Sequence, residues 1–173
     1  MKKILLISDT HSDLDNFIVK HANDADEIWH AGDIGNIEWF QDFSKIVYGK
    51  TFRAVYGNID DTKVRAKFPK INAFEVEKIK VIIIHIAGNY SNLNIEAKQA
   101  INEYKPKIFI CGHSHILKVQ FNSLKGFLFM NPGAAGNHGF HKVRTMLKFE
   151  IDNGDIKNLN VIETERKKMS IVD

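Results

Sequence analysis

Two histidines that are one residue apart, His113 and His115, follow a short apolar run and a glycine in this sequence. The run 107–110 is rich in β-branched and aromatic residues, which predicts a buried strand, and Gly112 marks its end. The two imidazoles are therefore expected at a strand end, and Gly112 makes easier the sharp turn that would let them converge. Imidazole is the commonest metal ligand among side chains. Alone, the pair fits either a metal site or two ordinary core or surface histidines, so the rest of the sequence has to decide.

The same arrangement, an apolar run followed by a ligand-type side chain, recurs four more times along the chain. Each run is short and resembles a strand, and in two cases a glycine directly precedes the polar residue. The polar residues that follow the runs 3–7, 27–30, 52–56 and 81–84 are Asp9 and His11, Asp33, Asn58, and His85, respectively. Because sites in open α/β sheets lie beyond the carboxyl ends of the strands, we expect these side chains to meet.

The candidate ligands offer oxygen and nitrogen donors and no thiolate. Such a mixture suits two divalent transition ions that share one bridging carboxylate, for which we expect Asp33. Each residue also has an ordinary interpretation: Asp9 as a turn residue, Asn58 as a left-handed residue after a glycine, His85 as the end of a strand. The coincidence at five separate strand ends favours the metal centre over these separate interpretations.

The remaining pattern predicts the elements that position these residues. Helical spacing predicts a helix through residues 14–21, capped by Ser12 or Asp13, and another from Asn92 or Asn94 to Tyr104. A short helix is predicted around residues 40–43, a hairpin around 75–80, strands at 117–121, 127–130, 145–150 and 156–162, and a tight turn at 152–155. Alternating strands and helices in the first two-thirds favour a parallel sheet, and the last third favours an antiparallel meander. Two packed sheets with helices outside satisfy both patterns.

Length and composition indicate the general class of protein. The chain has 173 residues, 44% of them hydrophobic and 26% charged, with a net charge of +3, which predicts one globular domain spanning residues 1–173. The single cysteine, Cys111, cannot form an internal disulfide and is expected in the core. No signal pattern or long apolar segment is present, so we expect a cytoplasmic protein without a membrane span. No basic stripe interleaved with aromatic residues indicates a nucleic-acid site.

Taken in order, the motifs resemble a known family. Asp9-Thr10-His11, Gly32-Asp33, Gly57-Asn58, His85 and Gly112-His113-Ser114-His115 match the pattern of the calcineurin-like metallophosphoesterases, specifically the small cap-free bacterial and archaeal phosphodiesterases. Asn131-Pro132-Gly133 also resembles that subgroup. The resemblance implies an α/β fold, a four-layer α-β-β-α sandwich of two mixed sheets flanked by helices. It implies Asp9, His11, Asp33 and His115 around one ion and Asp33, Asn58, His85 and His113 around the other.

The resemblance also implies an activity, the hydrolysis of small-molecule phosphodiesters by in-line attack of a hydroxide that bridges the two ions. Mn²⁺ is expected first, with Fe, Zn, Co and Ni as alternatives. The leading alternative function is a catalytically weak protein-binding scaffold, because a eukaryotic sorting-complex subunit resembles this fold without activity. A nuclease is disfavoured, since the sequence has no obvious basic groove or DNA-binding extension. A homo-oligomer is compatible with the sequence.

The sequence departs from the family pattern at Ile59, at Ile86 and in the segment 137–141. Ile59 stands where many members carry a histidine that donates a proton, although the small phosphodiesterases often have cysteine there. Ile86 follows His85 where the family usually has glycine. His138 and His141, after the Asn-Pro-Gly turn, are candidates to reach substrate, and the alternative is that they are plain surface histidines. His30 is expected to support the ligands or to pack nearby.

Overall fold

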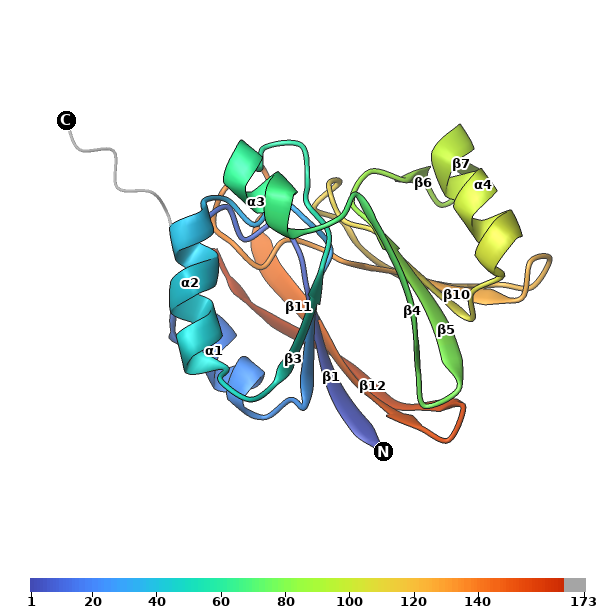
Figure 1. Ribbon diagram of the computed structural model, residues 1–173, viewed down its shortest axis with the longest axis horizontal. Helices are drawn as coiled ribbons and strands as arrows, with labels where there is room; N and C mark the ends of the chain where they lie inside the picture. The colour runs from blue at the N-terminus through green and yellow to red at the C-terminus, as the bar shows by residue number, and fades with distance from the viewer. Residues whose placement is uncertain (167–173) are drawn as a thin grey trace.

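The computed structural model describes residues 1–166, which form two large β-sheets with helices on their outer faces, and one small two-stranded sheet (Figure 1). In chain order the elements are β1 (Lys2–Ile7), α1 (Asn16–Asn23), β2 (Glu27–His30), α2 (Ile37–Ile46), β3 (Thr51–Ala54), α3 (Thr62–Lys67), β4 (Ile71–Val76), β5 (Ile79–Ile84), β6 (Gly88–Asn89), β7 (Asn92–Leu93), α4 (Ile95–Tyr104), β8 (Ile108–Ile110), β9 (Leu117–Asn122), β10 (Phe127–Pro132), β11 (Val143–Asp152) and β12 (Asp155–Glu165). No helix in residues 1–166 is long and apolar enough to cross a membrane.

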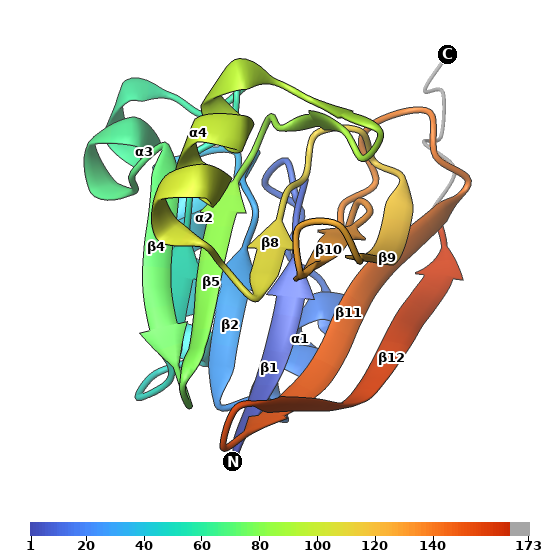
Figure 2. The same cartoon turned by 90° about the vertical axis from the view of Figure 1, so that its right-hand side faces the viewer.

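Both large sheets are mixed. The first has the strand order β12-β11-β1-β2-β3, and the second has the order β4-β5-β8-β10-β9. Strands β1, β2 and β3 are parallel, as are β5, β8 and β10. The antiparallel pairs are β1–β11 and β11–β12 in the first sheet and β4–β5 and β9–β10 in the second. The arrowheads of β1, β5 and β8 point to the same end of the molecule in Figure 2. The carboxyl ends of the parallel strands of both sheets therefore meet at one edge.

Three apolar clusters fill the spaces between four layers. The central cluster lies between the sheets and includes Leu6 of β1 and Ile83 of β5. A second cluster joins the other face of β1, including Ile7, to α1 and α2, and a third joins β5 and β8 to α4. Both faces of β1 are thus buried, which explains why its sequence is a continuous apolar run rather than an alternating one. The predicted α-β-β-α sandwich is confirmed.

Some local predictions were wrong. The cap of α1 is Asp15 rather than Ser12 or Asp13, because the Asp13 carboxylate is already bonded to Asn137 and the backbone of Ser12 pairs with Ile34. The last third of the chain is not one meander, since β9 and β10 join the second sheet and β11 and β12 join the first. Helix α3 and the small β6–β7 hairpin were not predicted.

Other local predictions are confirmed. Asn94 caps α4 by accepting a hydrogen bond from the Ala97 amide at 2.8 Å. The turn between β11 and β12 has Asn153 and Gly154 at φ values of 50° and 93°. Two successive left-handed residues are what a two-residue hairpin loop requires, and Asn-Gly adopts them readily. Cys111 is buried in the core, and burial raises the pKa of its thiol to about 12.

Candidate metal centre

The seven polar residues singled out in the sequence all lie beyond the carboxyl ends of strands, at the edge where the two sheets meet. They are Asp9 and His11 after β1, Asp33 after β2, Asn58 after β3, His85 after β5, and His113 and His115 after β8. Three of the strands belong to the first sheet and two to the second. The site is therefore shared between the sheets.

Six of these residues form two groups in which the potential ligand atoms lie within 4.8 Å of one another. One group is Asp9, His11 and His115, and the other is Asp33, His85 and His113. Asp33 also faces the first group, since its Oδ1 lies 3.2 Å from Nε2 of His85 and its Oδ2 lies 3.6 Å from Nε2 of His11. This carboxylate directs one oxygen toward each of two cation-binding positions.

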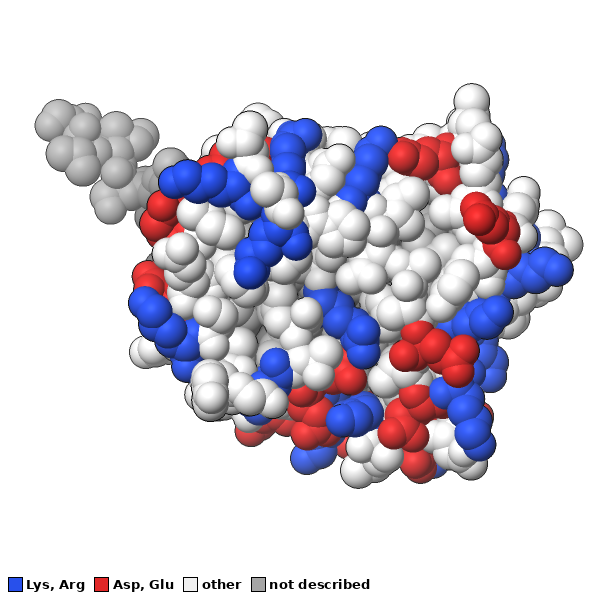
Figure 3. Space-filling model, viewed as in Figure 1, with Lys and Arg blue, Asp and Glu red and all other residues white. Residues whose placement is uncertain are grey.

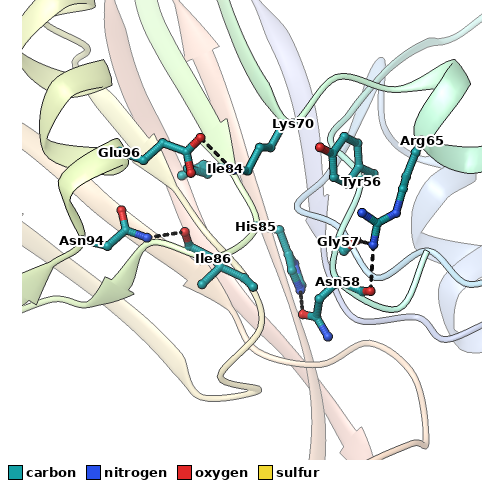
Figure 4. Close-up of a pocket in the computed structure, with 10 residues that line it drawn as sticks. All are labelled: Tyr56, Gly57, Asn58, Arg65, Lys70, Ile84, His85, Ile86, Asn94 and Glu96. Carbon is teal, nitrogen blue, oxygen red and sulfur yellow. Dashed lines mark hydrogen bonds and ion pairs between the residues drawn. The ribbon is translucent and has the colours of Figure 1, made fainter. Parts of the chain in front are cut away.

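The hydrogen bonds of His85 show which of its nitrogens faces the second group. Its Nδ1 lies 2.7 Å from the carbonyl oxygen of Ala31, which can only accept, so Nδ1 carries the proton and donates. In the neutral ring Nε2 is then a bare acceptor, and it faces Oδ1 of Asn58 at 3.1 Å (Figure 4). It also faces Oδ1 of Asp33 at 3.2 Å. Three acceptors that converge in this way need a cation between them.

His141 fixes the ring of His115 in a similar way. Nε2 of His141 donates to the carbonyl oxygen of Gly136 at 3.0 Å, which leaves Nδ1 of the neutral ring as an acceptor. That atom lies 3.3 Å from Nδ1 of His115, so the His115 Nδ1–H donates to it. Nε2 of His115 is then bare and faces Oδ1 of Asp9 at 3.3 Å. His141 therefore lies behind a candidate ligand, and its ring also lines the cavity over the site.

Two buried atoms in the first group have no hydrogen-bond partner among the described residues: Oδ1 of Asp9 and Nε2 of His11. A buried polar atom without a partner costs about 1–3 kcal/mol, so such atoms are rare in native proteins. Here both atoms point into a group of three potential ligands. Carboxylate and imidazole donors in this arrangement fit a divalent transition ion.

The pKa shifts of the candidate ligands also favour a bound cation at this site. Burial lowers the pKa of His85, but the hydrogen bond with Asp33 and the charges of Asp9 and Asp33 outweigh it, and the pKa is raised above its ordinary value. Burial raises the pKa of Asp33, but its contact with His85 outweighs burial and holds the pKa below the usual range. Burial lowers the pKa of His11 despite both carboxylates. The two buried carboxylates thus favour a positive charge at this position.

Five of the seven residues adopt the left-handed backbone conformation. They are Asp9, His11, Asp33, His113 and His115, with φ values of 53°, 47°, 54°, 69° and 57°. This conformation costs L-residues roughly 1–2 kcal/mol each and persists only where the surroundings enforce it. Here the loops after β1 and β2 enforce it, since the amide of Asp9 donates to Gly32 at 2.9 Å and that of His11 to Asp33 at 3.0 Å.

The glycines of the motifs are required by close packing against the ligands. A Cβ atom on Gly57 would lie 2.0 Å from Oδ1 of Asp33, and one on Gly112 would lie 2.1 Å from Oγ of Ser8 and 3.0 Å from Oδ2 of Asp9. Neither glycine has a positive φ. They therefore make room for the ligands, in addition to ending their strands as the sequence indicated.

Asp60 supports the site and was not singled out in the sequence. Its carboxylate accepts hydrogen bonds from the amides of Gly35 and Gly57, each at 2.7 Å, and so joins the loop of Asp33 to the loop of Asn58. Burial raises the pKa of Asp60 even though these hydrogen bonds oppose the shift. The neighbouring Asp61 caps α3. The sequence showed an acidic pair and gave no signal to distinguish the buried member from the cap.

His30 also supports the ligand loops, as the sequence analysis expected. Its Nδ1 accepts a hydrogen bond from the amide of Gly32 at 3.1 Å, so Nε2 is protonated and donates to Oγ1 of Thr10 at 2.9 Å. The Thr10 hydroxyl in turn donates to the carbonyl oxygen of Ile34 at 3.0 Å. Complete burial lowers the pKa of His30 to about 3, so the ring is neutral. A second brace is Asn131, whose amide donates to the carbonyl oxygen of Gly112 at 2.9 Å.

A cavity of about 560 Å³ opens over the two groups. It is lined by His11, Asp33, Asn58, Ile59, His113, Ser114, His115, Ile116, His138, Gly139, Phe140 and His141. No Lys or Arg within residues 1–166 lines it. Three large apolar side chains on its wall are exposed: Ile59 by 46%, Ile116 by 67% and Phe140 by 105%. His138 also lines the cavity, with its ring 4.7 Å from that of His11.

Comparison with solved structures identifies the fold. An archaeal phosphodiesterase is 21% identical, with a TM-score of 0.74 over 94% of this chain and 99% of that chain. A predicted phosphoesterase from Streptococcus pneumoniae is 22% identical, with a TM-score of 0.66 over 95% and 90%. Vps29 from Entamoeba histolytica, in a structure with zinc, is 16% identical, with a TM-score of 0.71 over 95% and 99%.

The sequence itself was compared with curated proteins and with family models. No curated protein matches it. The model of the calcineurin-like phosphoesterase superfamily domain matches residues 1–154, a stretch that contains every candidate ligand and, of the twelve strands within residues 1–166, all but β12. By this match the chain belongs to the calcineurin-like phosphoesterase superfamily.

Proposed function

We propose that this protein is a phosphodiesterase that holds two divalent transition ions. Asp9, His11, Asp33 and His115 would bind one ion, and Asp33, Asn58, His85 and His113 would bind the other. The observation that carries the proposal is the carboxylate of Asp33, which directs one oxygen toward each group. Bound ions of this kind lower the pKa of water toward neutrality and neutralise charge on phosphate oxygens. Mn²⁺ is the ion we propose first.

The side chains around the ions have separate tasks in this proposal. His141 and the carbonyl oxygen of Ala31 keep Nε2 of His115 and of His85 free of a proton. Within residues 1–166, His138 is the imidazole of the cavity wall that is neither a candidate ligand nor a brace of one, and in this proposal it contacts substrate. The exposed side chains of Ile59, Ile116 and Phe140 favour an apolar or aromatic ester group on this side of the phosphate.

The proposal is tested by hydrolysis of bis-p-nitrophenyl phosphate, with Mn²⁺ added in one series and a chelator in the other. We expect turnover with Mn²⁺ and none with chelator. A screen of nucleotides, cyclic nucleotides and glycerophosphodiesters then identifies the substrate class. Absence of turnover with every divalent transition ion would contradict the proposal.

The bridge is tested by the metal content of two variants after dialysis. Asp33→Ala should lose both ions, because neither group keeps a full donor set, and activity should fall by at least about 100-fold. Asn58→Ala should weaken one ion only, since its amide is a single neutral donor beside His85. Two equivalents of metal retained by Asp33→Ala would show that this carboxylate is not the bridge.

A second candidate function is that of a protein-binding scaffold with weak or no catalysis. The observation that favours it is the exposed apolar rim of Ile59, Ile116 and Phe140 around the site, together with the similarity to Vps29. The complete donor set argues for the enzyme, because a scaffold does not need seven converging ligands. Turnover in the bis-p-nitrophenyl phosphate assay separates the two functions.

A further inference from the structure

A second cavity, of about 390 Å³, lies directly beside the metal-ligand groups (Figure 4). It is lined by Tyr56, Gly57, Asn58, Arg65, Lys70, Ile84, His85, Ile86, Asn94 and Glu96. Asn58 borders both this cavity and the larger one, and His85 connects this wall to the second ligand group. A substrate whose phosphate lies at the metal centre can therefore extend one ester group into either cavity.

The two cavities differ in charge. The larger one has no lining Lys or Arg from residues 1–166 and carries three exposed apolar side chains. The smaller one has two cationic side chains, Arg65 from α3 and Lys70 from the segment before β4, and one acidic residue, Glu96 of α4. Figure 3 shows Lys and Arg side chains near acidic ones on the face that it presents. The lining of the smaller cavity has one more cationic than acidic side chain.

Arg65 is held in place by the loop that carries Asn58. Its Nε donates to the carbonyl oxygen of Asp60 at 2.6 Å, and its Nη2 donates to those of Gly57 and Asn58 at 3.3 and 2.9 Å. The guanidinium carbon also lies 4.9 Å from the centre of the Tyr56 ring. Nη1 makes no hydrogen bond with any residue from 1 to 166. Because carbonyl oxygens leave the positive charge uncompensated, this arginine is an ordered cation with a free donor.

Lys70 is held differently. Its Nζ lies 2.8 Å from Oε1 of Glu96, and both side chains are partly exposed, by 56% and 39%. Exposed ion pairs of this kind contribute little to stability, so an anionic ligand can replace Glu96 as the partner of Lys70 at small cost. Arg65 and Lys70 together offer two cations to a phosphate, and charge-assisted hydrogen bonds to phosphate are among the strong ones.

We propose that this smaller cavity is a subsite for a second anionic group of the substrate, a phosphate or phosphonate on one ester arm, bound by Arg65 and Lys70. The inference rests on the proposed phosphodiesterase function and specifies its substrate class. The preferred substrate is an asymmetric diester, with an apolar or aromatic arm toward Ile59, Ile116 and Phe140 and an anionic arm toward the two cations.

Two chromogenic diesters that differ only in one arm provide the test: p-nitrophenyl 3-phosphonopropyl phosphate and p-nitrophenyl propyl phosphate. Both release the same nitrophenolate, so leaving-group chemistry cancels in their ratio. We expect kcat/KM of the Mn²⁺-loaded protein to be at least about tenfold higher for the phosphonate, mainly through a lower KM. Equal values for the two diesters would overturn the subsite.

Three variants distinguish binding of the anionic arm in the smaller cavity from a general effect of the protein's net charge. Lys70→Met should remove most of the preference for the phosphonate, whereas Glu96→Gln should increase it, because the partner of Lys70 is neutralised. Lys63→Met is the matched control, since Lys63 belongs to α3, is exposed, and also pairs with a glutamate, but does not line the cavity. If Lys63→Met and Lys70→Met change the preference equally, the effect is due to net charge and the subsite is wrong.

Equilibrium binding provides a measurement that does not need turnover. Calorimetry with the Mn²⁺-loaded protein compares propane-1,3-bisphosphonate with propylphosphonate, in the wild-type protein and in the same three variants. We expect the bisphosphonate to bind more tightly, and Lys70→Met to abolish most of the difference. If diesters are hydrolysed but neither assay depends on Lys70, the subsite fails while the phosphodiesterase proposal stands. If no diester is hydrolysed, that proposal fails and the binding comparison alone decides the subsite.

Discussion

At the scale of single residues, the site depends on which atom each side chain presents. Two of the candidate imidazole ligands present Nε2, because their Nδ1–H groups donate to Ala31 and to His141. Asp33 presents both oxygens, one to each group. Ile59 presents only an alkyl group to the cavity, although its backbone amide donates to Oδ1 of Asp33 at 3.1 Å.

His141 should control the affinity for metal rather than the contact with substrate. His141→Phe removes the acceptor for the His115 Nδ1–H, so we expect Mn²⁺ to bind about 10–100-fold more weakly. His141→Gln should restore part of the affinity, because its side-chain oxygen can accept the same hydrogen bond. Calorimetric titration with Mn²⁺ measures both.

The control for this prediction is His138→Phe, which changes the other histidine of the same segment. It should leave Mn²⁺ affinity unchanged and reduce turnover if His138 contacts substrate. Wild-type Mn²⁺ affinity in His141→Phe would show that His141 does not orient the ligand.

The side chain of Ile59 should determine how the rate of hydrolysis depends on the leaving group. An alkyl side chain cannot donate a proton, and general acid catalysis is typically worth about 10²–10⁴-fold. We therefore expect aryl diesters to be hydrolysed much faster than alkyl diesters, with a steep dependence of rate on leaving-group pKa. Ile59→His should flatten that dependence by helping alkyl esters most.

A series of aryl and alkyl methyl phosphodiesters, assayed with both proteins, measures this slope. A shallow slope in the wild-type protein would mean that another group donates the proton. His138 would then be the first candidate, because His141 is already bonded to Gly136 and His115.

At the scale of elements, five loops at strand ends carry the site and brace one another. Asp60 joins the loops after β2 and β3, His30 joins those after β1 and β2, and Asn131 of β10 holds the loop after β8. The loops hold five candidate ligands in the left-handed conformation. These contacts between loops restrict the backbone of the candidate ligands, and such restriction reduces the cost of ordering them around an ion.

Gly57→Ala tests this close packing. The added methyl carbon would lie 2.0 Å from Oδ1 of Asp33, so we expect the loop to shift, stability to fall by about 1–3 kcal/mol, and Mn²⁺ affinity to drop. Gly126→Ala is the control. Nothing lies within 4 Å of its added carbon, but its φ of +72° costs about 1–2 kcal/mol.

Urea unfolding and Mn²⁺ titration of both variants decide the outcome. Both should lose stability, but only Gly57→Ala should lose metal affinity. Normal Mn²⁺ binding by Gly57→Ala would contradict the close-packing argument.

At the scale of the whole molecule, the site joins the two sheets. Each of the two ligand groups takes residues from both sheets, so bound ions would connect the sheets at the edge where their parallel strands end. His30 is fully buried and braces the ligand loops of the first sheet. Because its pKa is shifted by burial, the stability of the fold should depend on pH.

Stability should fall in acid because of His30. Its pKa in the folded protein is about 3, below the ordinary value of 6.5, so only the unfolded chain takes up this proton as the pH falls from about 6.5 toward 3. The contribution of neutral His30 to the free energy of unfolding is therefore complete above pH 6.5. Below that pH the free energy of unfolding decreases by about 1.4 kcal/mol per pH unit.

Urea unfolding of the metal-free protein at several pH values, compared with His30→Gln, isolates this contribution, because the other titrating groups are common to both proteins. The difference in stability between them should shrink as the pH falls through this window. Parallel curves would exclude His30 as the cause.

The sequence by itself determined the class of fold and the residue types of the site. Apolar runs that end in glycine, aspartate or histidine mark buried parallel strands, and such strands place their carboxyl ends at one edge, so convergence of the seven polar residues followed from local pattern. The cap of α1 and the splitting of the last four strands between two sheets did not follow, because both depend on contacts between distant segments, such as that of Asp13 with Asn137.

Only the tertiary structure decided which residues support the candidate ligands and which surround them. It showed that His141 lies behind His115, that Asp60 rather than Asp61 joins two ligand loops, and that Arg65 and Lys70 line one cavity beside the ligands. These relations join residues that are far apart in the chain or that differ only in burial. Local sequence encodes the propensity of a segment, but burial and the direction of a hydrogen bond are fixed by packing between segments, which no local pattern records.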